Sequence, residues 1–130
     1  MIIPIFEKRD PSMRIVLLMS IVLFVGVSCS QIKEKHITEV PQAELDTILL
    51  VDVRTPKEYN DGHLVNAMNI DWKSDDFKLG FETIDKDKTI YLYCRSGKRS
   101  ADATRYLDSL GYKRVYSLKG GYVAYKEAQQ

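Results

Sequence analysis

The residues of this chain with the clearest chemical potential are one cysteine and the cations that follow it. They occupy residues 94–100, which read Cys94-Arg95-Ser96-Gly97-Lys98-Arg99-Ser100. A thiolate is the form of cysteine that attacks sulfur, phosphorus or carbon, and nearby cations favour it over the thiol. Three cations lie within five residues of Cys94. The pattern therefore predicts a nucleophilic cysteine in an anion-binding loop.

Two elements must hold this loop in place. Residues 89–93 form an apolar run rich in β-branched and aromatic side chains, which predicts a buried strand. Near Ser100 begins a predicted amphipathic helix that Gly111 ends, with small or apolar residues three or four positions apart at Ala101, Thr104, Leu107 and Leu110. A loop from a parallel strand to a helix points its backbone N–H groups at the space between them, where the helix dipole also favours an anion.

Each residue of this segment also has a plain structural interpretation. A free cysteine is often buried for packing alone, and Gly97 is compatible with an ordinary turn. The combination of strand, cysteine, cationic loop and helix start within twelve residues favours the functional interpretation.

The rest of the chain alternates strand-like and helix-like segments. Strands are predicted at residues 48–53, 67–70 and 115–118, and helices at residues 41–45, 56–59 and 122–128. The polar stretch 71–88 is expected to be irregular or to hold a short helix. The alternation predicts an α/β domain with a mainly parallel central sheet of about five short strands flanked by helices.

Three segments together resemble the signatures of the rhodanese-like domains. Residues 51–59 with Gly62-His63-Leu64 resemble the amino-terminal signature, residues 94–100 the active-site loop, and residues 118–122 the carboxyl-terminal signature. The resemblance extends over roughly residues 37–128. Two positions differ from the family pattern: Val65-Asn66 stands where Pro-Gly is usual, and Tyr122 or Tyr125 replaces a frequent Trp.

The resemblance implies a sulfurtransferase that needs no cofactor. A donor such as thiosulfate is attacked by Cys94, which becomes a persulfide, and a thiol or cyanide then removes the outer sulfur. The loop provides the substrate-binding candidates, which are Arg95, Ser96, Gly97, Lys98 and Arg99. Its partners are then small molecules, and a monomer is expected.

Charged residues near the strand 48–53 are interpreted as structural. Arg54 and Glu58 lie four residues apart and are expected to pair, which the resemblance makes a clamp at the strand end. Asp52 is expected near the same sheet edge as Cys94. The resemblance makes His63 structural, and with two histidines in the chain no metal site is expected.

Two other functions stay open. Tyrosine-phosphatase-type and arsenate-reductase loops also place a cysteine and an arginine around an anion, with five residues between them, whereas four separate Cys94 from Arg99. The shorter loop suits a smaller sulfur-centred anion. A non-catalytic sulfur-binding or partner-binding module is the second alternative.

Residues 1–29 are interpreted as a lipoprotein-type signal peptide. The apolar run 15–27 follows Lys8, Arg9 and Arg14 and is too short to span a bilayer comfortably. Residues 25–29 resemble a bacterial lipobox, which implies lipidation of Cys29, with ordinary cleavage as the alternative. Met13 is an alternative start to Met1.

These boundaries predict the rest of the organisation. Residues 30–36 are expected to be a tether and residues 37–130 the domain, anchored by lipid in the cell envelope and facing the periplasm or the cell exterior. Without residues 1–29, acidic and basic residues balance, which argues against a nucleic-acid partner. Cys94 is then the one free thiol, so sulfur bound there must be removed by an outside molecule.

Overall fold

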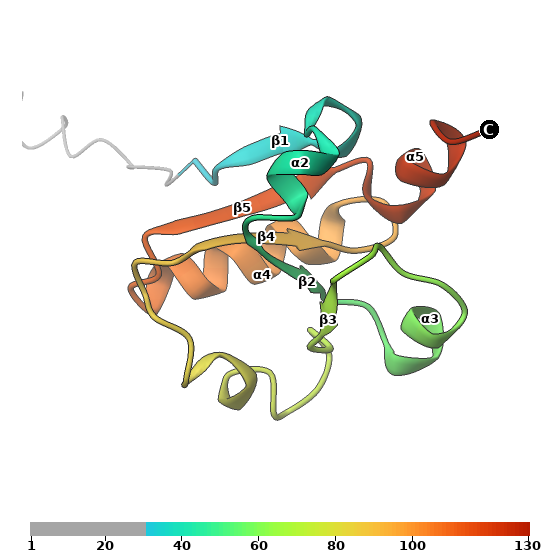
Figure 1. Ribbon diagram of the computed structural model, residues 1–130. Helices are drawn as coiled ribbons and strands as arrows, with labels where there is room; N and C mark the ends of the chain where they lie inside the picture. Colours follow the sequence, from blue (N-terminus) through green and yellow to red (C-terminus); the bar gives the residue numbers. More distant parts are fainter. Residues whose placement is uncertain (1–30) are drawn as a thin grey trace, which may run out of the picture. The chain divides into compact units, whose positions relative to one another are not determined.

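Residues 31–130 are described by a computed structural model (Figure 1). The predicted signal peptide and Cys29 lie outside these described residues. Within residues 31–130, no helix combines the length and the apolar character needed to cross a membrane.

A five-stranded parallel sheet forms the centre of the described domain. Its strands follow the spatial order β1-β5-β4-β2-β3. They are β1 (Glu34–His36), β2 (Leu49–Asp52), β3 (Met68–Asn69), β4 (Thr89–Tyr93) and β5 (Arg114–Lys119). The helices are α2 (Gln42–Leu45), α3 (Pro56–Asn60), α4 (Lys98–Ser109) and α5 (Gly121–Glu127), with 3₁₀ helices η1 (Ile37–Glu39) and η2 (Leu79–Phe81). The predicted α/β class and parallel sheet are confirmed.

Alternate residues of the central strand β4 enter two separate cores. Ile90 and Leu92 pack with residues of α4, whereas Tyr91 and Tyr93 pack on the opposite face with residues of α2 and α5. All four side chains are at most 3% exposed. Because both faces of the strand are covered, an almost continuous apolar run was needed there. The strand therefore ends in a well-packed frame that holds the loop after Tyr93.

The predicted tether is wrong for residues 34–36, which form β1. This edge strand pairs in parallel with β5, with Glu34 opposite Ser117. The segment is polar because an edge strand is only partly buried, so its sequence carries no apolar signal. The domain therefore begins before residue 37.

Asn66 occupies a backbone conformation that glycine usually adopts. Its φ is +64°, in the left-handed region. Asparagine tolerates this region better than other side chains. Val65-Asn66, which stands where the family usually has Pro-Gly, therefore still forms the turn between α3 and β3.

Candidate active site

Cys94 directly follows β4 and lies beneath a loop that leads into α4. The residue is 1% exposed. Its Sγ accepts a hydrogen bond from the Gly97 N–H at 3.0 Å and lies 3.7 Å from the Ser100 Oγ. Gly97 is the N-cap of α4. The loop thus surrounds the sulfur with donors from the helix start, as the strand-loop-helix pattern predicts.

These donors determine the ionisation of the thiol. Burial by itself raises the pKa of Cys94, but hydrogen bonds from the Ser100 N–H and hydroxyl and from the Gly97 and Ser96 N–H groups outweigh it. The resulting pKa lies below the ordinary value of a cysteine. At neutral pH, Cys94 is therefore ionised to the thiolate in a larger fraction of the molecules than a cysteine of ordinary pKa would be.

Ser117 supports this arrangement and was not predicted as a site residue. Its Oγ lies 2.8 Å from the Ser100 Oγ, which in turn lies 3.0 Å from the Gly97 carbonyl oxygen. Both serines are completely buried. A serine inside the apolar strand 115–118 was the available signal, but its partner could not be read from the sequence.

Gly120 and Gly121, at the start of α5, let this helix pack directly on the cysteine loop. The Tyr122 N–H donates to the Cys94 carbonyl oxygen at 2.9 Å, and the Val123 N–H donates to that of Arg95 at 3.1 Å. Gly121 has a φ of +56°, and a Cβ there would lie 2.5 Å from the Cys94 carbonyl oxygen. A side chain at this position is incompatible with the contact, because that oxygen belongs to the backbone.

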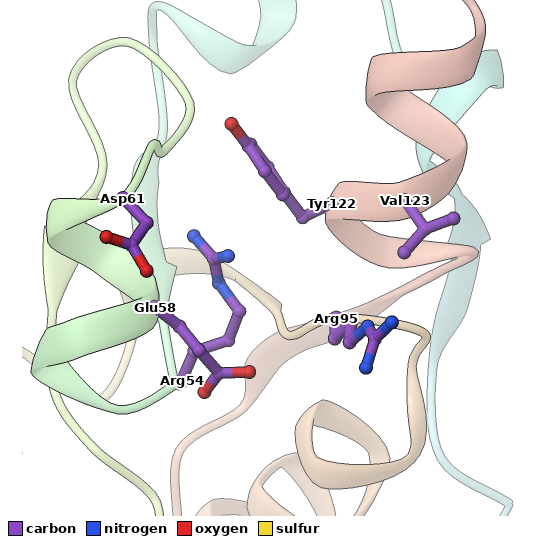
Figure 2. A pocket seen from close by; sticks show the side chains of 6 residues that line it. All are labelled: Arg54, Glu58, Asp61, Arg95, Tyr122 and Val123. Carbon is purple, nitrogen blue, oxygen red and sulfur yellow. The ribbon is translucent and has the colours of Figure 1, made fainter.

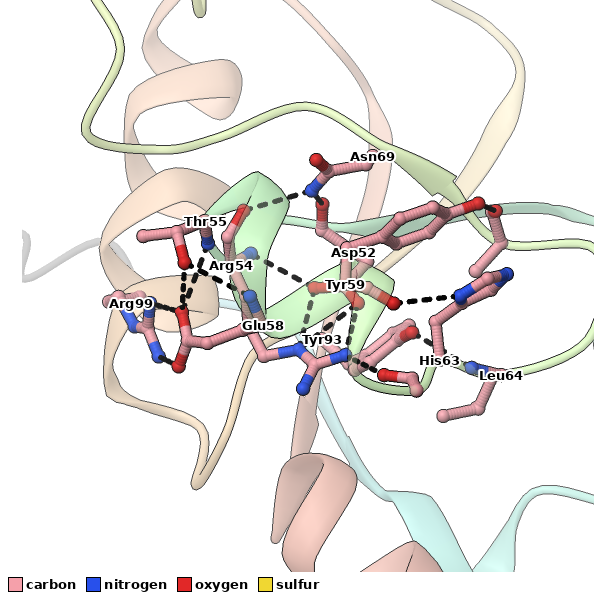
Figure 3. A network of polar contacts seen from close by, with 12 residues as sticks. Asp52, Arg54, Thr55, Glu58, Tyr59, His63, Leu64, Asn69, Tyr93 and Arg99 are labelled. Atoms are coloured by element: carbon pink, nitrogen blue, oxygen red, sulfur yellow. Dashed lines mark hydrogen bonds and ion pairs between the residues drawn. The ribbon is translucent and has the colours of Figure 1, made fainter.

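Arg54 pairs with Asp52 rather than with Glu58. Its Nη2 lies 2.6 Å from the Asp52 Oδ2 and 2.7 Å from the Gly62 carbonyl oxygen (Figure 3). Arg54 is 4% exposed and Asp52 is fully buried. The Tyr122 ring covers the guanidinium, with its centroid 4.3 Å away. The pair ties the end of β2 to the turn after α3.

Glu58 instead forms a two-point ion pair with Arg99, so the predicted Arg54–Glu58 pair is wrong. Both N–O distances are 2.8 Å. A capping box with Thr55 holds the Glu58 carboxylate at the start of α3, where it faces α4. The Arg99 guanidinium has the largest effect on Glu58 and, together with the Thr55 N–H and hydroxyl, lowers its pKa to about 2. Partial burial opposes this lowering. Arg99 therefore links α4 to α3.

A small cavity lies beside the cysteine loop. Its volume is about 250 Å³, and its lining residues are Arg54, Glu58, Asp61, Arg95, Tyr122 and Val123 (Figure 2). Arg95 is the one candidate binding residue of the loop that lines it. Lys98 does not line the cavity: its side chain is 87% exposed, and its Nζ lies 3.4 Å from the Asp102 Oδ2. Ser96 is exposed.

His63 has a structural environment. Its Nδ1 lies 2.9 Å from the Tyr59 carbonyl oxygen, and its ring stacks on Tyr59 with centroids 3.7 Å apart. These contacts link α3 to the turn that follows it. They give His63 no contact with Cys94.

The fold and the site define a class of α/β protein in which a parallel strand presents a buried cysteine to a loop of backbone donors. The model of the Rhodanese-like domain matches residues 36–128 of this chain. The chain therefore belongs to the rhodanese-like family.

Several curated relatives are named as sulfurtransferases. The sulfurtransferase of Allochromatium vinosum is 39% identical over 83 residues, which cover 64% of this chain and 76% of that protein. The thiosulfate sulfurtransferase GlpE of Shewanella oneidensis is 33% identical over 89 residues, covering 68% of this chain and 86% of that one. A crystal structure of a rhodanese-like domain protein from Staphylococcus aureus matches with a TM-score of 0.63 at 28% identity, over 72% of this chain and 90% of that one. These likenesses support membership of a sulfurtransferase-like family.

Proposed function

We propose that this protein transfers sulfane sulfur from thiosulfate or a related donor to a thiophilic acceptor through a persulfide on Cys94. The observation that carries the proposal is the hydrogen bond from the Gly97 N–H to the Cys94 Sγ at 3.0 Å, in a loop that lowers the pKa of that thiol. The sulfurtransferase relatives point to the same class of reaction.

The first half-reaction transfers one sulfur atom to the enzyme. The Cys94 thiolate attacks the outer sulfur of thiosulfate, the donor S–S bond breaks, and sulfite leaves with the electron pair. Arg95 lines the adjacent cavity and has no ion pair or side-chain hydrogen bond within residues 31–130, so it is available to a sulfonate group. In the second half-reaction an acceptor removes the outer sulfur and regenerates the thiolate.

The contacts of Arg99 argue against the phosphatase and arsenate-reductase alternatives. Such loops need an arginine that turns toward the anion bound above the cysteine. The Arg99 guanidinium is instead held by both oxygens of Glu58. A site that depends on Arg99 as an oxyanion ligand would first have to break this pair.

The intact mass of the full-length protein after incubation with thiosulfate tests the proposal. We expect the gain of one sulfur atom, its removal by cyanide with release of thiocyanate, and neither event in a Cys94→Ala control. Absence of both the mass gain and thiocyanate in the wild-type protein would contradict the proposed reaction and favour a binding module.

We further propose that Cys29 is lipidated and that the protein works as an anchored monomer facing the periplasm or the cell exterior. The apolar run 15–27 and the small residues before Cys29 support this proposal. Fractionation of cells that express the wild-type protein and a Cys29→Ser variant is the test. Recovery of the wild-type chain from the cytoplasm would refute it.

A further inference from the structure

The edge strand β1 runs further along β5 than the central strand β4 does. The register between β5 and β4 ends at Ser117, which lies opposite Leu92. The register between β5 and β1 begins at the same Ser117 and continues to Lys119, which lies opposite His36 (Figure 1). The end of β5 is therefore supported by β1 where β4 no longer runs beside it.

This end of β5 contacts two residues that hydrogen-bond the Cys94 sulfur. Gly97, whose N–H donates to the Cys94 Sγ at 3.0 Å, lies against the backbone of β5, since a Cβ added to Gly97 would lie 3.5 Å from the Lys119 Cα. Ser100 has its Oγ 2.8 Å from the Ser117 Oγ and 3.7 Å from the Cys94 Sγ. A shift of the end of β5 would therefore disturb both groups beside the sulfur.

The docking of β1 depends on a small number of contacts. The Ser117 N–H donates to the Lys33 carbonyl oxygen at 2.9 Å. The Lys35 Nζ lies 2.6 Å from the Glu44 Oε1 and 5.6 Å from the centroid of the Tyr116 ring in β5. The strand is three residues long, and two of these residues are exposed. Such a short edge strand detaches at a lower free-energy cost than a strand paired and covered on both sides.

We propose that β1 controls the reactivity of Cys94 by holding the end of β5 against the cysteine loop. Lys35 is then a positioning residue, because it contacts no substrate but keeps β1 docked. When β1 detaches, the loop loses this support, the hydrogen bonds to the sulfur weaken, and a smaller fraction of Cys94 is ionised. The effect on sulfur transfer rests on the proposed function, whereas the effect on the ionisation of Cys94 does not.

Proline substitutions in the full-length protein test this role of β1. Backbone groups alternate between the two sides of a strand, and the Lys33 carbonyl faces β5, so the Lys35 N–H faces β5 as well. Lys35→Pro removes this N–H together with the ion pair to Glu44. Ile32→Pro is the matched control, because Ile32 precedes β1 and lies outside its register with β5.

Two measurements are made on each variant: the pH profile of Cys94 alkylation by iodoacetamide, followed by mass spectrometry on the peptide that contains Cys94, and the rate constant for sulfur loading from thiosulfate. In Lys35→Pro the alkylation profile should move to higher pH. Loading near neutral pH should fall about threefold, as expected when one hydrogen bond to the thiolate weakens. Ile32→Pro should keep the wild-type profile. Lys35→Met, which keeps the N–H but removes the Nζ, should move the profile in the same direction by less.

The possible failures are distinguishable. An unchanged alkylation profile in both Lys35 variants would overturn the inference, since β1 would then contribute to stability alone. An equal shift in Ile32→Pro would also overturn it, because any change ahead of the domain would then have the same effect. If Lys35→Pro does not fold, the profile of Lys35→Met decides. If the wild-type protein loads no sulfur, the proposed function fails, and the alkylation profiles still decide the role of β1.

Discussion

At the scale of single residues, the reactivity of Cys94 depends on donors that do not themselves react. Ser100 contributes both its N–H and its hydroxyl to lowering the pKa of the Cys94 thiol, and Ser117 contacts that hydroxyl. Because burial opposes ionisation, the thiolate form depends on these hydrogen bonds. The two serines therefore matter to the chemistry although no substrate touches them in the proposed reaction.

We predict that Ser100→Ala raises the pKa of Cys94. The variant loses the hydroxyl donor but keeps the backbone N–H, so the rate of alkylation by iodoacetamide at neutral pH should fall roughly threefold to tenfold. The profile of alkylation rate against pH should move to higher pH. Ser96→Ala is the control, since the exposed Ser96 acts through its N–H alone. An unchanged profile in Ser100→Ala would contradict the role of the hydroxyl.

At the scale of elements, the contact between α5 and the cysteine loop keeps the loop in shape. Gly121 allows it, because a Cβ there would lie 2.5 Å and 2.6 Å from the carbonyl oxygens of Cys94 and Arg95. The Tyr122 and Val123 N–H groups complete the contact. The carboxyl-terminal signature thus acts on the site through the backbone.

We predict that Gly121→Ala lowers sulfur transfer more than tenfold, because α5 must move away from the loop. Gly111→Ala is the matched control. Gly111 also has a positive φ of +92°, but a Cβ there would meet only the Lys86 side chain at 3.7 Å. Both variants should lose about 1–2 kcal/mol from backbone strain, as measured by urea unfolding. Equal activities in the two variants would show that the contact does not matter.

The Glu58–Arg99 pair joins α3 to α4 and makes stability depend on pH. The folded protein lowers the pKa of Glu58 from 4.5 to about 2. The pair therefore stabilises the fold fully above about pH 4.5, and its contribution is lost as the pH falls toward 2.

We predict that Glu58→Gln lowers the free energy of unfolding by about 1 kcal/mol near neutral pH, a value reduced for solvent screening of this partly exposed pair. The difference between variant and wild type should shrink as the pH falls below about 4.5. Urea unfolding of both proteins at about pH 7 and about pH 3 measures it. A difference that stays constant between these conditions would assign the effect to packing instead of charge.

At the scale of the whole molecule, β1 completes the sheet from a polar segment. It pairs along β5, and the Lys35 Nζ lies 2.6 Å from the Glu44 Oε1 of α2. The first described residues therefore belong to the folded domain and not to a free linker.

We predict that a chain starting at residue 37 is less stable than one starting at residue 31. The lost strand hydrogen bonds are worth about 1 kcal/mol each, so thermal unfolding should occur several degrees lower. Removal of residues 128–130 is the control, because these residues are exposed and follow α5. Equal midpoints for chains starting at 31 and 37 would mean that β1 adds nothing.

The sequence by itself determined the elements whose signals are local. The run at residues 89–93 had to be apolar because both of its faces are covered, and the helix after the loop follows from residues three and four apart. The resemblance placed Cys94 in its loop and named the family that the comparisons support.

Only the tertiary structure decided the partners. Arg54 lies as close to Glu58 in sequence as helical pairs do, yet the Thr55 capping box turns Glu58 toward Arg99 and leaves Arg54 to Asp52. In the same way, residues 34–36 form a strand because they pair with β5, and Ser117 belongs to the site because its hydroxyl contacts that of Ser100. Apart from the Asp52–Arg54 pair, these contacts join segments far apart in the chain, so they depend on how the elements pack and leave no pattern in the local sequence.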